Sequence, residues 1–313
     1  MNRHEPVLLA EVLEALNLDK NQPKSDPSRS DKNIIDCTVG DAGHSEKILE
    51  KIGENGKLLA IDADTESILR AKQFLYKFEG QITFVRDNFV NLKKIVLENN
   101  FENVNGILMD FGWSTPQFEM RGRGFSFNNL EENLDMRYSE NQENTAEHVV
   151  NNYTENELVE IFKKYGEEKL SKQIAEKIIK IRKEREIKKV GDLVEIILQV
   201  YREKLKTEKE IPWIGGIHPA TKVFQALRIE VNKELEVIEK VLPQAIEILQ
   251  SGGRLAVISF HSLEDGLVKH FFKSESAKKN IKIITKKPLI CSREEYQKNP
   301  RARSAKLRII EKI

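Results

Sequence analysis

Short apolar runs alternate with helical patterns of apolar residues over the first third of the chain. The runs have the length of buried strands and lie at 34–40, 57–62, 82–85 and 106–111. The segments between them carry apolar residues three and four positions apart, which is the spacing of an amphipathic helix. A further helix is expected over 5–17. This alternation predicts an α/β fold, with a parallel sheet and helices on both of its faces.

Polar residues mark where two of these helices should begin. Ser45 follows the first apolar run and Asp64 follows the second. Short polar side chains of this kind accept hydrogen bonds from the first backbone N–H groups of a helix. We therefore expect both residues to be helix N-caps.

A helical pattern replaces the alternation between residues 145 and 209. Apolar stripes recur there, with Lys and Glu on the opposite face. Residues 142–211 are therefore interpreted as an all-helical domain, inserted into a discontinuous sheet domain of residues 1–141 and 212–313.

The strand pattern returns in the last third of the chain. A helix should begin at Pro219, a favourable first helical residue, and end at Leu242 because Pro243 cannot continue it. A later helix is expected to have Ser262 as its cap. The remaining runs are expected to be strands, the last two pairing with each other, and lie at 254–260, 281–285 and 305–310.

The composition excludes several classes of protein. Of the 313 residues 39% are hydrophobic, which is too many for a disordered chain. No stretch approaches the roughly 18 apolar residues of a membrane span, and three glutamates within residues 5–14 argue against a signal peptide. Cys37 and Cys291 are far apart, which argues against a disulfide scaffold or a zinc site. We expect a cytoplasmic protein without a membrane partner or a bound metal.

Charge is distributed unevenly, although the whole chain has a formal charge of only +1. Residues 278–313 contain 12 Lys and Arg against 3 Asp and Glu, so they carry +9 and residues 1–277 carry −8. Basic residues on ordered strands are the electrostatic footprint of a nucleic-acid partner. Arg301 and Arg303 lie in the densest part of this segment and are candidate phosphate contacts.

The turn after the first apolar run has the chemistry of a cofactor site. Gly40, Ala42 and Gly43 let the backbone approach a ligand, and Asp62 follows 22 residues after Gly40. An acid about 20 residues beyond a glycine-rich turn can bind ribose hydroxyls. The two features together favour an adenosine-type cofactor, whereas a tight turn or a helix cap would explain either one alone.

Asp110 ends the fourth apolar run, at the position where open α/β sheets bind their ligands. The tripeptide Asp110-Phe111-Gly112 is similar to the magnesium motif of protein kinases, but the other kinase motifs are missing. It is also loosely similar to the loops of amino-methyltransferases, without their prolines. His261, after the run at 254–260, is a weaker candidate for a catalytic base.

Cations and aromatic rings alternate in the loop of residues 121–138. This combination suits phosphate contact and base stacking on single-stranded nucleic acid. An ordered loop with buried phenylalanines would explain it equally well. The residues concerned are Arg121, Arg123, Phe125, Phe127, Arg137 and Tyr138.

Many blocks of this sequence, in family order, resemble the ribosomal RNA small subunit methyltransferase H family, also called MraW. They cover nearly the whole chain and include 4–16, 36–49, 60–64, 109–117, 123–137, 218–232, 252–265 and 299–308. The resemblance implies a Rossmann-like class I methyltransferase sheet and S-adenosylmethionine as cofactor. It further implies methylation of the exocyclic N4 amine of a cytidine in the decoding region of 16S rRNA, within the small ribosomal subunit. A homodimer is left open.

The resemblance also implies roles for individual residues. Asp62 matches the ribose-binding acid, and Phe89 matches a ring beside the adenine. Ala42 stands in place of a glycine, which matters only if its φ is positive; Cys37 and Trp113 also depart from the family pattern, without loss of a functional polar group. The residues that match cofactor contacts are Ala42, Gly43, His44, Asp62, Phe89, Asp110 and Gln117.

The same residues suggest how a methyl transfer would work. A cytosine amine is a weak nucleophile, so positioning does most of the work, and Asp110 or a neighbouring backbone carbonyl would accept its proton. The helical insertion and the loop 121–138 would form the RNA side of the site, with Arg301 and Arg303 gripping the RNA backbone. The rival functions are a nucleotide-dependent oxidoreductase and a non-enzymatic rRNA-binding factor.

Overall fold

The computed structural model of the protein describes residues 5–18, 31–112, 122–139, 142–207, 209, 211 and 216–313. The chain divides into two compact units, one of residues 1–113 and 235–313 and the other of residues 114–234. The helical insertion expected over 142–211 lies within the second unit. Across the described ranges, no helix is both long and apolar enough to cross a membrane.

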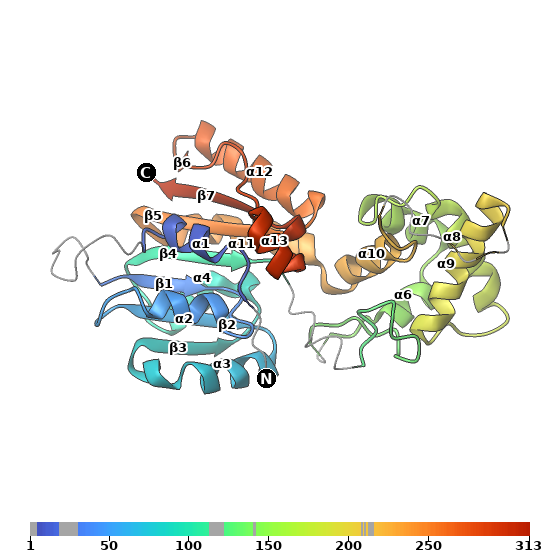
Figure 1. Ribbon diagram of the computed structural model, residues 1–313, viewed down its shortest axis with the longest axis horizontal. Helices are drawn as coiled ribbons and strands as arrows, with labels where there is room; N and C mark the ends of the chain where they lie inside the picture. The colour runs from blue at the N-terminus through green and yellow to red at the C-terminus, as the bar shows by residue number, and fades with distance from the viewer. Residues whose placement is uncertain are drawn as a thin grey trace. The chain divides into compact units, whose positions relative to one another are not determined.

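A seven-stranded sheet forms the centre of the first unit (Figure 1). Its strands are β1 (Asn33–Asp36), β2 (Lys57–Asp62), β3 (Ile82–Arg86), β4 (Val104–Asp110), β5 (Leu249–Ser259), β6 (Ile281–Ile283) and β7 (Lys306–Lys312). They lie in the order β3-β2-β1-β4-β5-β7-β6, and β7 is antiparallel to both of its neighbours. This is the 3-2-1-4-5-6 order of a doubly wound sheet with one antiparallel strand inserted. The predicted parallel sheet and terminal strand pair are both confirmed.

Helices cover both faces of this sheet, because successive side chains of each strand point to opposite sides. Ile34 belongs to the core on one face and Ile35 to the core on the other, and both are fully buried. The first face is covered by α1 (Leu9–Ala15), α2 (Gly43–Leu49) and α3 (Thr65–Phe74). The second is covered by α4 (Leu92–Glu98), α11 (Glu234–Ile248) and α12 (Ser262–Ala277). Shorter helical segments are η1 (Tyr76–Gln81), η2 (Phe89–Asn91), α13 (Arg293–Lys298) and η3 (Pro300–Ser304).

The second unit is helical and has a core of its own. Its helices are α6 (Ala146–Asn152), α7 (Glu155–Lys164), α8 (Ser171–Arg182), α9 (Val190–Leu205) and α10 (Thr221–Asn232), so the helical pattern of 145–209 is confirmed. Phe162, Ile178 and Leu193 are fully buried in it. The unit extends beyond the expected insertion because α10 packs on α7, and because the Leu134 N–H donates to the Lys188 carbonyl, which ties the preceding loop to the helices.

The cap predictions for α2 and α3 have opposite outcomes. Asp64 is confirmed as the N-cap of α3, where its side chain accepts from backbone N–H groups of the first turn. Ser45 is wrong as a cap, because it lies inside α2 and Ala42 holds the N-cap position. The Ser45 hydroxyl instead donates to Asp36 Oδ2 at 2.7 Å, a contact between two different elements.

The predicted cap of α12 is also wrong by one residue. His261 holds the N-cap position, and Glu264 completes a capping box with it. The His261 Nδ1 atom accepts from the Glu264 backbone N–H at 3.4 Å, so this histidine has a structural role at the start of the helix. Ser262 is the first residue of the helix itself.

The helix expected to end before Pro243 is in fact two helices. α10 ends at Asn232, because Lys233 takes a left-handed conformation with φ of 52°. α11 then continues through Pro243 to Ile248. Its buried residues pack into the core on the second face of the sheet, and this packing outweighs the local cost of the proline.

Replacement of the exposed Pro243 by alanine should stabilise the protein. Inside a helix a proline costs about 3 kcal/mol relative to alanine, and its smaller unfolded-state entropy offsets up to about 1 kcal/mol of that cost. We expect Pro243→Ala to raise the free energy of unfolding in urea by about 2 kcal/mol. Glu239→Ala, at an exposed position of the same helix, should change it by less than about 0.5 kcal/mol. An unchanged or lower stability of Pro243→Ala would contradict this expectation.

Candidate active site

Three aspartates lie together at one edge of the sheet in the first unit. Asp36, Asp62 and Asp110 are the last residues of β1, β2 and β4. These strands are parallel neighbours, with β1 in the middle, so their carboxyl ends meet at the same edge. Ligands of open α/β sheets bind at this edge.

Asp36 connects β1 by hydrogen bonds to the loop that follows it and to α2. It is only 1% exposed, and its carboxylate accepts from the Thr38 N–H at 3.0 Å and from the Ser45 hydroxyl at 2.7 Å. The Thr38 hydroxyl in turn accepts from the Asp110 N–H at 2.9 Å. Burial raises the pKa of Asp36, which these hydrogen bonds partly oppose. Sequence reasoning missed Asp36 as a site residue, because the first apolar run was taken to continue to Gly40 whereas the strand ends at Asp36.

The turn between β1 and α2 depends on two left-handed residues. Gly40 has φ of 49° and Ala42 has φ of 61°. Glycine adopts this conformation without a steric penalty, whereas the methyl group of Ala42 costs about 1–2 kcal/mol there. Because the φ of Ala42 is positive, alanine in place of the family's glycine has a conformational cost at this position.

The Asp62 carboxylate is bound to the backbone on both sides. Oδ2 accepts from the Gly40 N–H at 3.0 Å, and Oδ1 accepts from the Asp64 N–H at 2.9 Å. Each oxygen retains a second lone pair, so both can also accept from the hydroxyls of a ribose. Burial raises the pKa of Asp62 to about 6.

His44 and Asp110 face each other across the same edge. The His44 Nε2 atom lies 2.9 Å from the Val7 carbonyl oxygen, which can only accept, so Nε2 carries a hydrogen. Nδ1 lies 3.8 Å from Asp110 Oδ2, and Asp110 Oδ1 accepts from the Gly112 N–H at 2.8 Å. Burial lowers the pKa of His44 and raises the pKa of Asp110 to about 6. The two atoms of this pair that can accept a proton, His44 Nδ1 and Asp110 Oδ2, therefore face each other.

Phe89 provides an aromatic ring at the start of η2. It stacks on Phe111, with ring centroids 6.1 Å apart, and both rings are partly buried against the core of the second face. A flat apolar surface of this kind suits a planar base. Gln117, Arg121 and Trp113, which the sequence also singled out, lie outside the described residues.

The candidate RNA-binding residues of the second unit make hydrogen bonds and ring contacts with other residues of that unit. Arg137 donates to both carboxylate oxygens of Asp135, at 2.7 and 2.9 Å. Phe125 is buried and stacks on Tyr138, with centroids 5.8 Å apart. Arg123 donates to the Arg137 carbonyl at 3.2 Å. These contacts favour the alternative interpretation of this segment as an ordered loop with buried rings.

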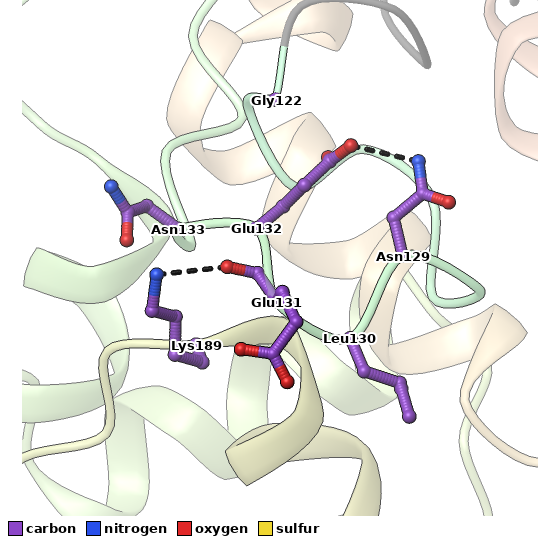
Figure 2. Close-up of a pocket in the computed structure, with 7 residues that line it drawn as sticks. All are labelled: Gly122, Asn129, Leu130, Glu131, Glu132, Asn133 and Lys189. Carbon is purple, nitrogen blue, oxygen red and sulfur yellow. Dashed lines mark hydrogen bonds between the residues drawn. The ribbon is translucent and has the colours of Figure 1, made fainter.

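A hollow of about 490 Å³ lies in the second unit (Figure 2). Figure 2 shows the Glu132 carboxylate bonded to the Asn129 side chain and the Lys189 ammonium group bonded to the Glu131 carbonyl. Two carboxylates in its wall disfavour a phosphate ligand. Its lining contains none of the candidate cofactor residues and consists of Gly122, Asn129, Leu130, Glu131, Glu132, Asn133 and Lys189.

Residues 1–313 match the model of the MraW methylase family. The chain belongs to this family. Two relatives from Clostridium botulinum, each named ribosomal RNA small subunit methyltransferase H, are 41% identical to this MraW methylase in an alignment of 326 positions that covers 99% of each chain. The solved structure of an rRNA methylase from Streptococcus thermophilus is 9% identical, covers 94% of this chain and 99% of its own, and has a TM-score of 0.42.

Membership of this family confirms the expected fold and cofactor. The protein is a methyltransferase with a Rossmann-like class I sheet, and its cofactor is S-adenosylmethionine. The carboxyl ends of β1, β2 and β4 fit that molecule. Asp62 offers acceptors for ribose hydroxyls, and the carboxylates gathered there favour a sulfonium cation.

Asp110 should make the folded protein less stable as the pH rises. Burial raises the pKa of this carboxyl from 3.8 to about 6, so the cost of burying its charge is fully present only above about pH 6. The Asp110 side chain is 16% exposed, which reduces this cost. Between pH 7.5 and pH 5 we expect the wild type to gain about 1 kcal/mol of unfolding free energy relative to Asp110→Asn.

Chemical denaturation at the two pH values measures this difference. Glu98→Gln, at an exposed position of α4, is the control for the loss of one surface carboxylate. A change of opposite sign for Asp110→Asn would show that Asp110 is not a buried carboxylate with a raised pKa.

Proposed function

We propose that this MraW methylase transfers a methyl group to the exocyclic N4 amine of a cytidine in the decoding region of 16S rRNA, within the small ribosomal subunit in the cytoplasm. Support for an rRNA substrate comes from the names of the relatives that are 41% identical over 99% of the chain. The observation that carries the proposal is the meeting of Asp62, His44 and Asp110 at one strand edge. There Asp62, which would bind the ribose, lies at the same end of the sheet as a pair that would accept a proton.

The cytosine amine needs help because its lone pair is conjugated with the ring. When bound, S-adenosylmethionine supplies an electrophilic methyl group on a positively charged sulfur. The amine must lose a proton when it is methylated, and Asp110 would accept this proton at Oδ2. A pKa of about 6 leaves this carboxylate ionised at neutral pH and basic enough to accept the amine proton. His44 Nδ1, 3.8 Å away, can share that proton.

The basic C-terminal segment of the first unit is proposed to bind the RNA backbone. Arg301 and Arg303 are exposed on η3, which is anchored to the core by the buried Ala302. An anchored segment presents its cations without a large loss of backbone entropy on binding. A target cytosine in folded rRNA must also be turned out of its stack to reach the strand edge.

Transfer of a labelled methyl group to isolated small subunits, with free 16S rRNA in parallel, tests the function directly. We expect the label in N4-methylcytidine after nucleoside digestion. Label in a different nucleoside would contradict the proposed target. Absence of any label from either substrate would favour a non-enzymatic rRNA-binding factor.

Asp62 and Asp110 should affect different steps. Asp62→Asn should raise the dissociation constant of S-adenosylmethionine about tenfold or more, because a charged hydrogen bond is worth roughly 1.5–3 kcal/mol. Asp110→Asn should lower turnover at saturating cofactor by about 100-fold or more. Calorimetric titration and methyl transfer separate the two effects, with Glu66→Gln on α3 as control. Unchanged turnover of Asp110→Asn would exclude its catalytic role.

Charge reversal at Arg301 and Arg303 should weaken RNA binding without changing cofactor binding. Loss of two phosphate contacts should lower affinity for the small subunit by about tenfold or more and reduce the slope of its salt dependence by about 2. Filter binding over a range of salt concentrations measures both quantities. Lys94→Glu on α4 is the control. Equal loss of cofactor affinity in Arg301→Glu/Arg303→Glu would indicate a structural role instead.

A further inference from the structure

Residues 5–8, here called the N-terminal strap, lie on the glycine turn of the cofactor site. A β-carbon at Gly43 would come within 3.2 Å of the Pro6 ring, so Pro6 covers this glycine closely. The next carbonyl, that of Val7, accepts from His44 Nε2 at 2.9 Å. The strap therefore contacts Gly43 and His44, the first two residues of α2.

The strap is held at two points by the C-terminal part of the first unit. Glu295 Oε1, on α13, accepts from the Leu8 N–H at 2.6 Å. Asn299 Nδ2 donates to the Glu5 carbonyl at 3.0 Å. Leu8 is fully buried and has φ of 53°, a left-handed conformation that persists in a leucine only when surrounding contacts hold it. The course of the strap thus depends on Glu295.

The position of the Val7 carbonyl fixes the state of His44. A carbonyl oxygen only accepts, so its contact keeps the hydrogen of the neutral ring on Nε2. The Nδ1 lone pair then faces Asp110 Oδ2 at 3.8 Å. Displacement of the strap would remove this constraint and let the ring adopt the Nδ1–H tautomer.

We propose that Glu295 is a positioning residue for the methyl-transfer site. By holding the Leu8 N–H it places the Val7 carbonyl, and through that carbonyl it sets the ring of His44 against Asp110. Glu295 itself lies outside the strand edge and touches none of the candidate cofactor residues in the contacts described here. The proposal rests on the proposed function only in taking the turn 40–44 as part of the cofactor site.

The test compares Glu295→Ala and Glu295→Asp with Glu294→Ala, an exposed glutamate on the same helix. Alanine lacks the acceptor and aspartate is one methylene too short, so both should release the strap. Nitrogen-15 NMR of the imidazole rings reports the tautomer of His44, assigned with a His44→Asn variant. Calorimetric titration of the same proteins gives the dissociation constant of S-adenosylmethionine.

We expect the wild type and Glu294→Ala to show the Nε2–H tautomer of His44. Glu295→Ala and Glu295→Asp should show a mixture of tautomers and a dissociation constant raised about tenfold. Glu295→Gln retains an acceptor oxygen and should restore most of the wild-type signal and affinity. If the alanine variant does not fold, the aspartate variant decides the question.

A pure Nε2–H signal in folded Glu295→Ala or Glu295→Asp would overturn the proposal. So would an equal effect of Glu294→Ala, since that would point to the charge of α13 and not to the hydrogen bond. Failure of the wild type to bind S-adenosylmethionine would instead defeat the proposed function, because the NMR signal of His44 does not require the cofactor.

Discussion

One buried and two partly buried carboxylates, at the carboxyl ends of three parallel strands, are the constraint on which the site depends. A buried carboxylate is tolerable only if hydrogen-bond donors replace the lost water. Asp36 obtains them from Thr38 and Ser45, and Asp62 obtains them from two backbone N–H groups. The turn after β1 and the start of α2 provide the donors from Thr38, Gly40 and Ser45, and the residue before α3 provides the Asp64 N–H.

The balance between burial and nearby donors also sets the pKa of Asp110, the proposed proton acceptor. Burial raises the pKa of Asp110, whereas a protonated His44 and the Gly112 N–H favour its charged form. The result is a pKa of about 6, which lets the carboxylate be ionised yet basic near neutral pH. The apolar cores above and below the sheet hold the strands in register, so the separation between His44 and Asp110 is set by the fold.

Local sequence patterns correctly predicted those elements whose stabilising contacts are close in the sequence. The apolar runs predicted the strands, and Asp64 was identified as a cap because its partners are in the next turn. Ser45 was misassigned because its hydroxyl serves Asp36 on another element. Pro243 was expected to end a helix, but packing of α11 on the sheet overrides the local preference.

The candidate site was predictable for a related reason. Asp62 and Asp110 could be found because strand ends in a parallel sheet meet at one edge, whatever the details of packing. The roles of Asp36, Val7 and Glu295 could not be found, since each depends on a contact between segments far apart in the sequence. The family resemblance supplied the cofactor, and the structure supplies the arrangement of residues that would hold it.

Hydrogen–deuterium exchange with and without S-adenosylmethionine tests this arrangement most directly. We predict that the cofactor slows exchange together at the ends of β1, β2 and β4, in residues 38–45, 62–66 and 109–112, and in the strap at 5–8. Slowed exchange confined to the second unit, for example around the hollow at 122–133, with no change at the strand edge, would contradict it.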